Sequence, residues 1–161
     1  MAEPSAFSKL VFGNLERLEK IVLALLIFIV TARYFGYTSN PSLLMLGLIT
    51  LGTVYYLFAF RPPAPQAEGT QQNFMSLLVT TILPKVLWIS CSVGAVGLAF
   101  YFNGLPGSRQ MLIIQTSTGV VGLIIWGIGN LQQTESLDRI TAPITRALPT
   151  MLIAVYILLQ K

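Results

Sequence analysis

Few residues of this chain could do chemistry, and the closest pair of them is acidic. Glu135 and Asp138 lie at the end of an apolar run, beside Arg139. Paired carboxylates can act as general acid and base when a substrate-shaped site encloses them. Because the loop around this pair is only a few residues long, a solvated helix cap is the favoured interpretation.

Cys91 is the single cysteine, and the chain has no histidine. One cysteine forms no intrachain disulfide, and without histidine a Cys–His dyad is excluded. In the middle of an apolar run a thiol behaves as a small hydrophobic group. No cluster of Cys, His and carboxylate residues in the sequence supplies metal ligands. We therefore expect no catalytic residue, no metal, no cofactor and no enzymatic activity.

Hydroxyl and amide groups inside the apolar runs allow two interpretations. One is a polar path for a small solute, formed by Thr50, Thr53, Gln115, Thr116 and Ser117. The other, which we favour, is helix packing, because buried polar side chains in lipid bond neighbouring helices and small residues let helices approach. The residues expected at such an interface are Ser90, Gly94, Gly97, Thr118, Gly119 and Gly122.

The elements that position these residues are membrane-spanning helices. The chain is 54% hydrophobic and only 10% charged, whereas soluble domains carry about 25% charged residues. A span needs about 20 mainly apolar residues, and four runs fit: 21–37, 43–60, 86–108 and 110–134. We predict an all-α, polytopic membrane protein whose residues 1–161 form a single integral membrane domain.

Two turns, at 38–42 and 103–107, join these spans into helical hairpins, because Pro and Gly reverse the chain. The hairpins, at about 18–60 and 77–131, are separated by a polar loop at 61–73. Lys20 aligns with Lys85 and Pro41 with Pro106 at one offset, so we predict a duplicated hairpin. Chance similarity among apolar residues is the alternative.

A partial third unit follows at 140–161. It predicts a short fifth helix that spans from near Ala142, and a helix lying in the membrane interface is the alternative. Before Lys85, residues 74–82 predict an in-plane helix, with a poorer version before Lys20. A plain extension of each span is the other interpretation.

The basic residues predict the orientation. If the N-terminus is cytoplasmic, the inner side receives Lys9, Arg17, Lys20, Arg61, Lys85, Arg139 and Arg146, and the outer side receives only Arg33, Arg109 and Lys161. This bias follows the positive-inside rule and does not indicate a nucleic-acid partner. The expected interface anchors are Lys20, Arg33, Lys85, Arg109 and Arg146. For Arg33 anion binding is the alternative, and Arg146 is expected to extend toward the inner interface.

The apolar runs contain no acid. Between Glu19 and Glu135 the only carboxylate is Glu68, in the polar loop. Proteins that move protons or cations usually keep an ionisable residue inside the bilayer. Their usual working group is therefore missing from these runs.

The first hairpin resembles that of the gliding-motility and type IX secretion protein GldL. The similar stretch runs from Phe35 to Pro63, including Pro41, Met45-Leu46 and the exit at 55–63, and Leu105-Pro106-Gly107 resembles that family's second turn. The family uses a glutamate in the second helix to carry protons. Here the aligned position, around Leu51, is apolar. The resemblance implies a bacterial inner membrane and a hairpin scaffold without the proton-carrying group.

Three functions remain open from the sequence. We favour a non-catalytic structural or accessory subunit whose partners are the lipid bilayer and other membrane subunits, or a second copy of itself. The alternative is a small-solute transporter or channel component that uses the hydroxyl-rich faces. A lipid-modifying enzyme is the weakest, because no nucleophile is paired with a base.

Overall fold

The computed structural model describes residues 6–37, 40–61, 81–131 and 138–160. These residues form helices and no strand. The helices are α1 (Ala6–Tyr34), α2 (Pro41–Ala59), α4 (Leu83–Phe102), α5 (Ser108–Leu131) and α6 (Asp138–Leu159). The predicted all-α class is confirmed.

Four of these helices are long and apolar enough to cross a membrane: α2, α4, α5 and α6. The C-terminal helix is therefore among them. Its apolar part, Thr141–Leu159, has 19 residues, which rise about 28 Å at 1.5 Å per residue. Helix α1, expected to supply the first span, is not in this group, because Glu16, Arg17, Glu19 and Lys20 occupy its middle.

The turns of both expected hairpins form by local chemistry. Helix α1 ends in a Schellman motif, in which Tyr37 N donates to Ala32 O and Gly36, at φ 78°, donates to Arg33 O. Helix α4 ends in the same way around Gly104. Asn40 caps the N-terminus of α2, because its Oδ1 accepts a hydrogen bond from Ser42 N in the first turn of that helix. The hairpins are present, whereas their origin by duplication stays a prediction.

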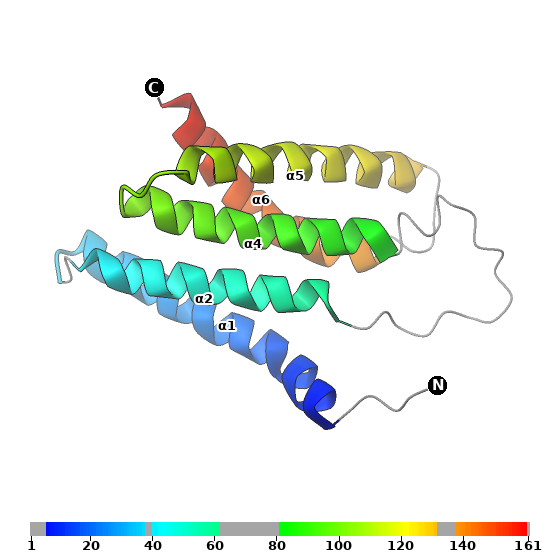
Figure 1. Ribbon diagram of the computed structural model, residues 1–161, viewed down its shortest axis with the longest axis horizontal. Coiled ribbons are helices and arrows are strands. Elements are labelled where there is room, and N and C mark those ends of the chain that lie inside the picture. The colour runs from blue at the N-terminus through cyan, green and yellow to red at the C-terminus, as the bar shows by residue number, and fades with distance from the viewer. Residues whose placement is uncertain (1–5, 38–39, 62–80, 132–137, 161) are drawn as a thin grey trace, which may run out of the picture.

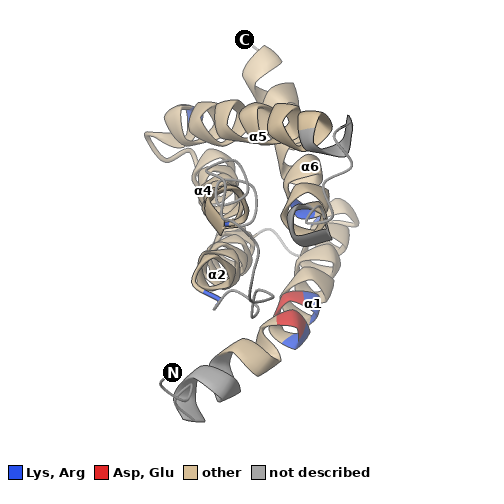
Figure 2. Ribbon diagram, turned by 90° about the vertical axis from the view of Figure 1, so that its right-hand side faces the viewer, with Lys and Arg blue, Asp and Glu red and all other residues tan. Residues whose placement is uncertain are grey.

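The helices form an up-and-down bundle around α4 (Figure 1). Helix α4 packs against α2, α5 and α6, and α1 packs mainly on α2. We call the end where α1, α4 and α6 begin the N-terminal end, and the opposite end the turn end. Helix α6 crosses the bundle obliquely, and Figure 2 views the N-terminal end, with α1 beside α6.

One expected feature at the N-terminal end is resolved, and another lies outside the description. Helix α1 is continuous from Ala6 through Lys20, so this segment extends the first apolar helix and is not a separate in-plane helix. The corresponding segment before Lys85 falls mostly outside the described residues, as do residues 62–73 of the polar loop.

Candidate functional site

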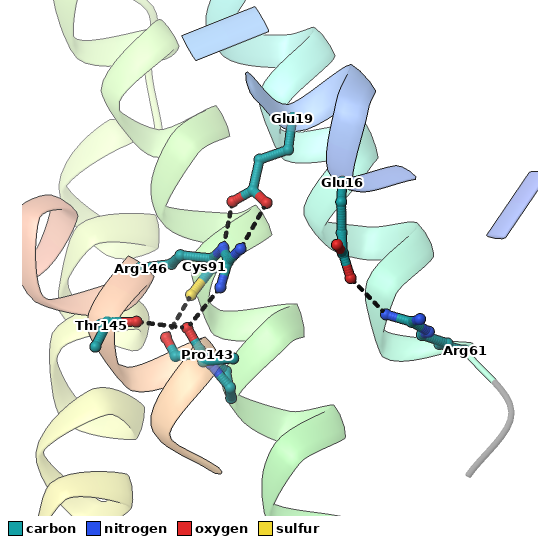
Figure 3. A network of polar contacts seen from close by, with 8 residues as sticks. Glu16, Glu19, Arg61, Cys91, Pro143, Thr145 and Arg146 are labelled. Atoms are coloured by element: carbon teal, nitrogen blue, oxygen red, sulfur yellow. Dashed lines mark hydrogen bonds and ion pairs between the residues drawn. The ribbon is translucent and has the colours of Figure 1, made fainter. Parts of the chain in front are cut away.

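The most unusual contact in the bundle is a buried ion pair between α1 and α6. Arg146 donates from Nε to Oε1 of Glu19 and from Nη2 to Oε2 of Glu19, the latter at 2.8 Å (Figure 3). Only 3% of the Glu19 side chain is exposed, against 31% of the Arg146 side chain. The pair joins residues that are 127 positions apart in the sequence.

Glu19 is buried because of its register on α1. It follows Leu15 by four positions and precedes Leu26 by seven, and both leucines are buried. Residues at these spacings share one face of a helix. This narrow stripe is the side of α1 that faces the bundle, so a carboxylate placed on it must enter the interior.

Arg146 lies inside the apolar part of α6. It comes five residues after Thr141, where that part begins, which corresponds to about 8 Å along the helix. Its Nη1 donates to Ala142 O at 3.2 Å. The guanidinium carbon also lies 5.3 Å from the centre of the Trp88 ring on α4, a cation–π distance.

The aromatic side chains of α2 and α4 complete the surroundings of the ion pair. Phe58 stacks on Trp88 with ring centres 4.5 Å apart, and Tyr55 lies 5.7 Å from the same ring. All three aromatic residues are buried. The carboxylate comes from α1, the guanidinium from α6, and the rings from α2 and α4. The ion pair together with the Trp88 contact therefore connects both hairpins with α6.

The energetics of this arrangement depend on its geometry. Removing two charges from water costs several kcal/mol per ion, and only close, hydrogen-bonded pairing returns it. A bidentate arginine–carboxylate pair supplies the strongest form of that pairing. In contrast, Glu16 and Arg61 form an exposed pair at 3.1 Å, of the kind worth roughly 0 to 1 kcal/mol.

A second polar cluster lies where α4, α5 and α6 meet. Gln115 is fully buried and donates from Nε2 to Thr150 Oγ1 at 2.7 Å, while Ser90 donates to Gln115 O at 3.1 Å. The Oε1 atom of Gln115 has no hydrogen-bond partner among the described residues. The Gln115 side chain occupies the space that a Cβ would take at Gly94.

The other expected path residues donate hydrogen bonds within their own helices. Thr50 and Thr53 are exposed on α2 and donate to Leu46 O and Ile49 O of their own helix. On α5, Thr116 donates to Leu112 O and the exposed Ser117 donates to Ile114 O. Each of these four hydroxyls is therefore satisfied by its own helix.

The residues expected at helix interfaces divide between two contacts. Ser90, Gly94 and Gly97 of α4 and Gly122 of α5 lie between α4 and α5. A Cβ at Gly119 would instead meet Met151 of α6. Thr118 is half-buried.

Among the expected interface anchors, Lys20, Arg33, Lys85 and Arg109 are exposed, and Arg146 differs because it is paired with Glu19. Glu135 lies outside the described residues, as does the side chain of Asp138. Cys91 is buried and its Sγ lies 3.7 Å from Pro143 O. Within the described residues, no group of three metal-ligating side chains is found.

The contact of Arg146 with Glu19 and Trp88 was not predicted from the sequence. One signal was available. Arg146 lies in an apolar segment between Pro143 and Pro149, and a cation at that depth needs an acid partner. In the predicted topology the acids at the same end of the bundle are those of residues 1–20 and the pair Glu135 and Asp138.

Comparison with known proteins returned no matching family model, curated protein or solved structure.

Proposed function

We propose that this protein is a non-catalytic integral membrane subunit that packs against the helices of other membrane subunits. Four helices that are long and apolar enough to cross a membrane indicate an integral membrane protein. The proposal of a packing role rests on the hydrogen bonds that the hydroxyl groups of α2 and α5 make. The hydroxyls of Thr50, Thr53, Thr116 and Ser117 donate to carbonyls of their own helices, which supports packing over a shared polar path.

The outer helix faces offer the surface that such packing requires. On α5, Ile114, Val121 and Ile124 are each more than half exposed, and so is Phe28 on α1. In a membrane these faces contact lipid or another helix. Association there depends on close van der Waals packing rather than on the hydrophobic effect.

The charge distribution supports a cytoplasmic N-terminus in this proposal. Arg17, Lys20, Arg61 and Lys85 lie toward the N-terminal end of the bundle, whereas Arg33 lies toward the turn end. Cytoplasmic ends of membrane proteins carry the excess of Lys and Arg. We propose the bacterial inner membrane on the basis of the GldL resemblance.

That resemblance also bears on what kind of subunit this is. Leu51, at the position of the family's proton-carrying glutamate, is buried within the chain's own bundle at 4% exposure. In a scaffold related to GldL, this position would contribute to packing inside the bundle where that family carries a charge. The proposed partner class, argued from the exposed faces of α1 and α5, is another membrane subunit, with a second copy of this chain as a special case.

Site-specific crosslinking in native membranes tests the proposal. A photoreactive residue at Ile124 or Phe28 should give protein adducts of defined mass, because these positions face outward. The matched control is Leu98, which is 3% exposed and should give none. The purified chain in liposomes should move neither protons nor small solutes.

The opposite pattern would favour the alternative function. Lipid adducts alone at both outward positions, together with solute flux through the purified chain, would replace the subunit proposal with a transporter or channel component. Flux that is lost on substituting Gln115, the one expected path residue that is fully buried, would locate the path.

A further inference from the structure

The groups around Arg146 are of the kind that form a binding site for an organic cation. One carboxylate, Glu19, accepts two hydrogen bonds from the guanidinium, and the ring of Trp88 lies beneath it. Phe58 and Tyr55 hold that ring by packing against it. A buried anion combined with aromatic faces is the chemistry by which proteins recognise organic cations.

Arg146 belongs to a segment of α6 that lacks some of its backbone hydrogen bonds. Pro143 and Pro149 lie three positions before and after Arg146. Proline lacks the N–H that would bond the carbonyl four residues earlier, so α6 loses backbone hydrogen bonds on both sides. Such points are where helices bend. Arg146 is also 31% exposed, so its guanidinium is not sealed inside the bundle.

We propose that Glu19, Trp88, Phe58 and Tyr55 form a binding site for a guanidinium cation, and that Arg146 occupies this site as a built-in ligand. The bidentate contact with Glu19 selects guanidinium over ammonium, because a planar fork matches both carboxylate oxygens. A free guanidinium compound binds when Arg146 leaves. Occupancy by Arg146 lowers the apparent affinity of the site for any external cation.

A site of this kind differs from a merely structural ion pair in a measurable way. Truncating Arg146 at Cβ removes the resident guanidinium but leaves the carboxylate and the rings. In either case the cavity that is left can take a guanidinium compound of matching size, but only an exchangeable site also binds the compound while Arg146 is present.

Trp88 provides the reporter for the experiment. The chain has two tryptophans, so Trp126→Phe leaves Trp88 as the only one. In this background, Arg146→Ala is titrated in mild detergent with ethylguanidinium chloride, and both Trp88 fluorescence and the thermal unfolding midpoint are followed. Ethylurea is the neutral planar control, and sodium chloride controls for ionic strength.

We expect a saturable fluorescence change and a rise in the unfolding midpoint of Arg146→Ala with ethylguanidinium alone. The protein that retains Arg146 should need roughly tenfold or more of the compound, because its own guanidinium competes. Adding Glu19→Gln to Arg146→Ala should abolish the response. No saturable response of the protein that retains Arg146, equal affinity with and without Arg146, equal stabilisation by ethylurea, or an unchanged response after Glu19→Gln would overturn the proposal.

Poor folding of Arg146→Ala leaves the proposal testable. In that case ethylguanidinium is added during solubilisation and the monodisperse fraction is measured by size-exclusion chromatography. A dose-dependent recovery that ethylurea does not reproduce shows that the cavity takes guanidinium, and a response of the protein that retains Arg146 to the same compound then supports the exchangeable site. No recovery, or no response with Arg146 present, counts against it.

Discussion

The ion pair between Glu19 and Arg146 should respond unequally to the loss of its two members. We consider Arg146→Met and Glu19→Met, each of which replaces one charged side chain by a long apolar one. Arg146→Met leaves a carboxylate that is 3% exposed and that has lost the two hydrogen bonds donated by Arg146. Uncompensated buried charges of this kind cost about 3 to 5 kcal/mol.

Glu19→Met should cost less, because the charge left behind is better placed. Arg146 keeps its contact with Trp88 and its hydrogen bond to Ala142 O, and 31% of its side chain already reaches solvent. A long basic side chain near a helix end can turn its charge toward the interface. We expect a loss of about 1.5 to 3 kcal/mol, the range of a hydrogen bond to a charged group.

The double variant separates charge pairing from packing. Replacing both members of a buried pair by apolar groups is often neutral or stabilising, so Glu19→Met/Arg146→Met should lie within about 1 kcal/mol of the unmodified protein. The single losses would then fail to add, and the double-mutant cycle would give a coupling energy of about 3 kcal/mol or more.

Equilibrium unfolding in mixed detergent micelles, followed by circular dichroism, measures these free energies. The two single variants serve as each other's control, because they differ only in which charge remains. The reasoning fails if Glu19→Met is as costly as Arg146→Met. It also fails if the double variant loses the sum of the two single effects.

Two further predictions concern sites outside this pair. Arg61→Gln should lower the free energy of unfolding by less than about 1 kcal/mol, because the contact of Arg61 with Glu16 is exposed. Added salt should reduce this difference, so unfolding is measured at low and high salt. A loss of several kcal/mol would contradict the prediction. Gly94→Ala should cost about 1 to 3 kcal/mol because the new methyl displaces the buried side chain of Gln115. Gly127→Ala, where nothing lies within 4 Å, should instead add about 0.5 to 1 kcal/mol through helix propensity, and equal effects at the two glycines would refute the assignment.

The spans and hairpins could be predicted because their causes are local. The length of an uncharged run decides whether a helix can cross the membrane, so the helices over Pro41–Ala59 and Leu83–Phe102 follow from the sequence directly. The turn around Gly104 has the same character, since a positive φ there depends on the residue itself. These features need no knowledge of neighbouring helices.

The partners of polar residues depend on helix rotation and could not be predicted. Thr50 and Gln115 are both polar residues within apolar runs, yet one is exposed and the other fully buried. The need of Gln115 for an interhelical partner follows from its chemistry. That the partner is Thr150 follows only from the crossing of α5 and α6.

Glu19 was overlooked for a related reason. It lies in a segment with Glu16, Arg17 and Lys20, all of which are exposed, and such a segment resembles a solvated terminus. The face that Glu19 shares with Leu15 and Leu26 is what takes it inside.

The buried carboxylate changes what the acid-free apolar runs mean. The bundle does contain an interior acid, but it comes from α1, outside the runs that lack one. Both of its oxygens accept hydrogen bonds from Arg146, so a second cation that is to engage both oxygens must displace that guanidinium. A working acid that carries charge through a membrane must instead be free to exchange its ligand. The pair therefore acts first as a closed connection between α1 and α6, and any exchange there begins with the departure of Arg146.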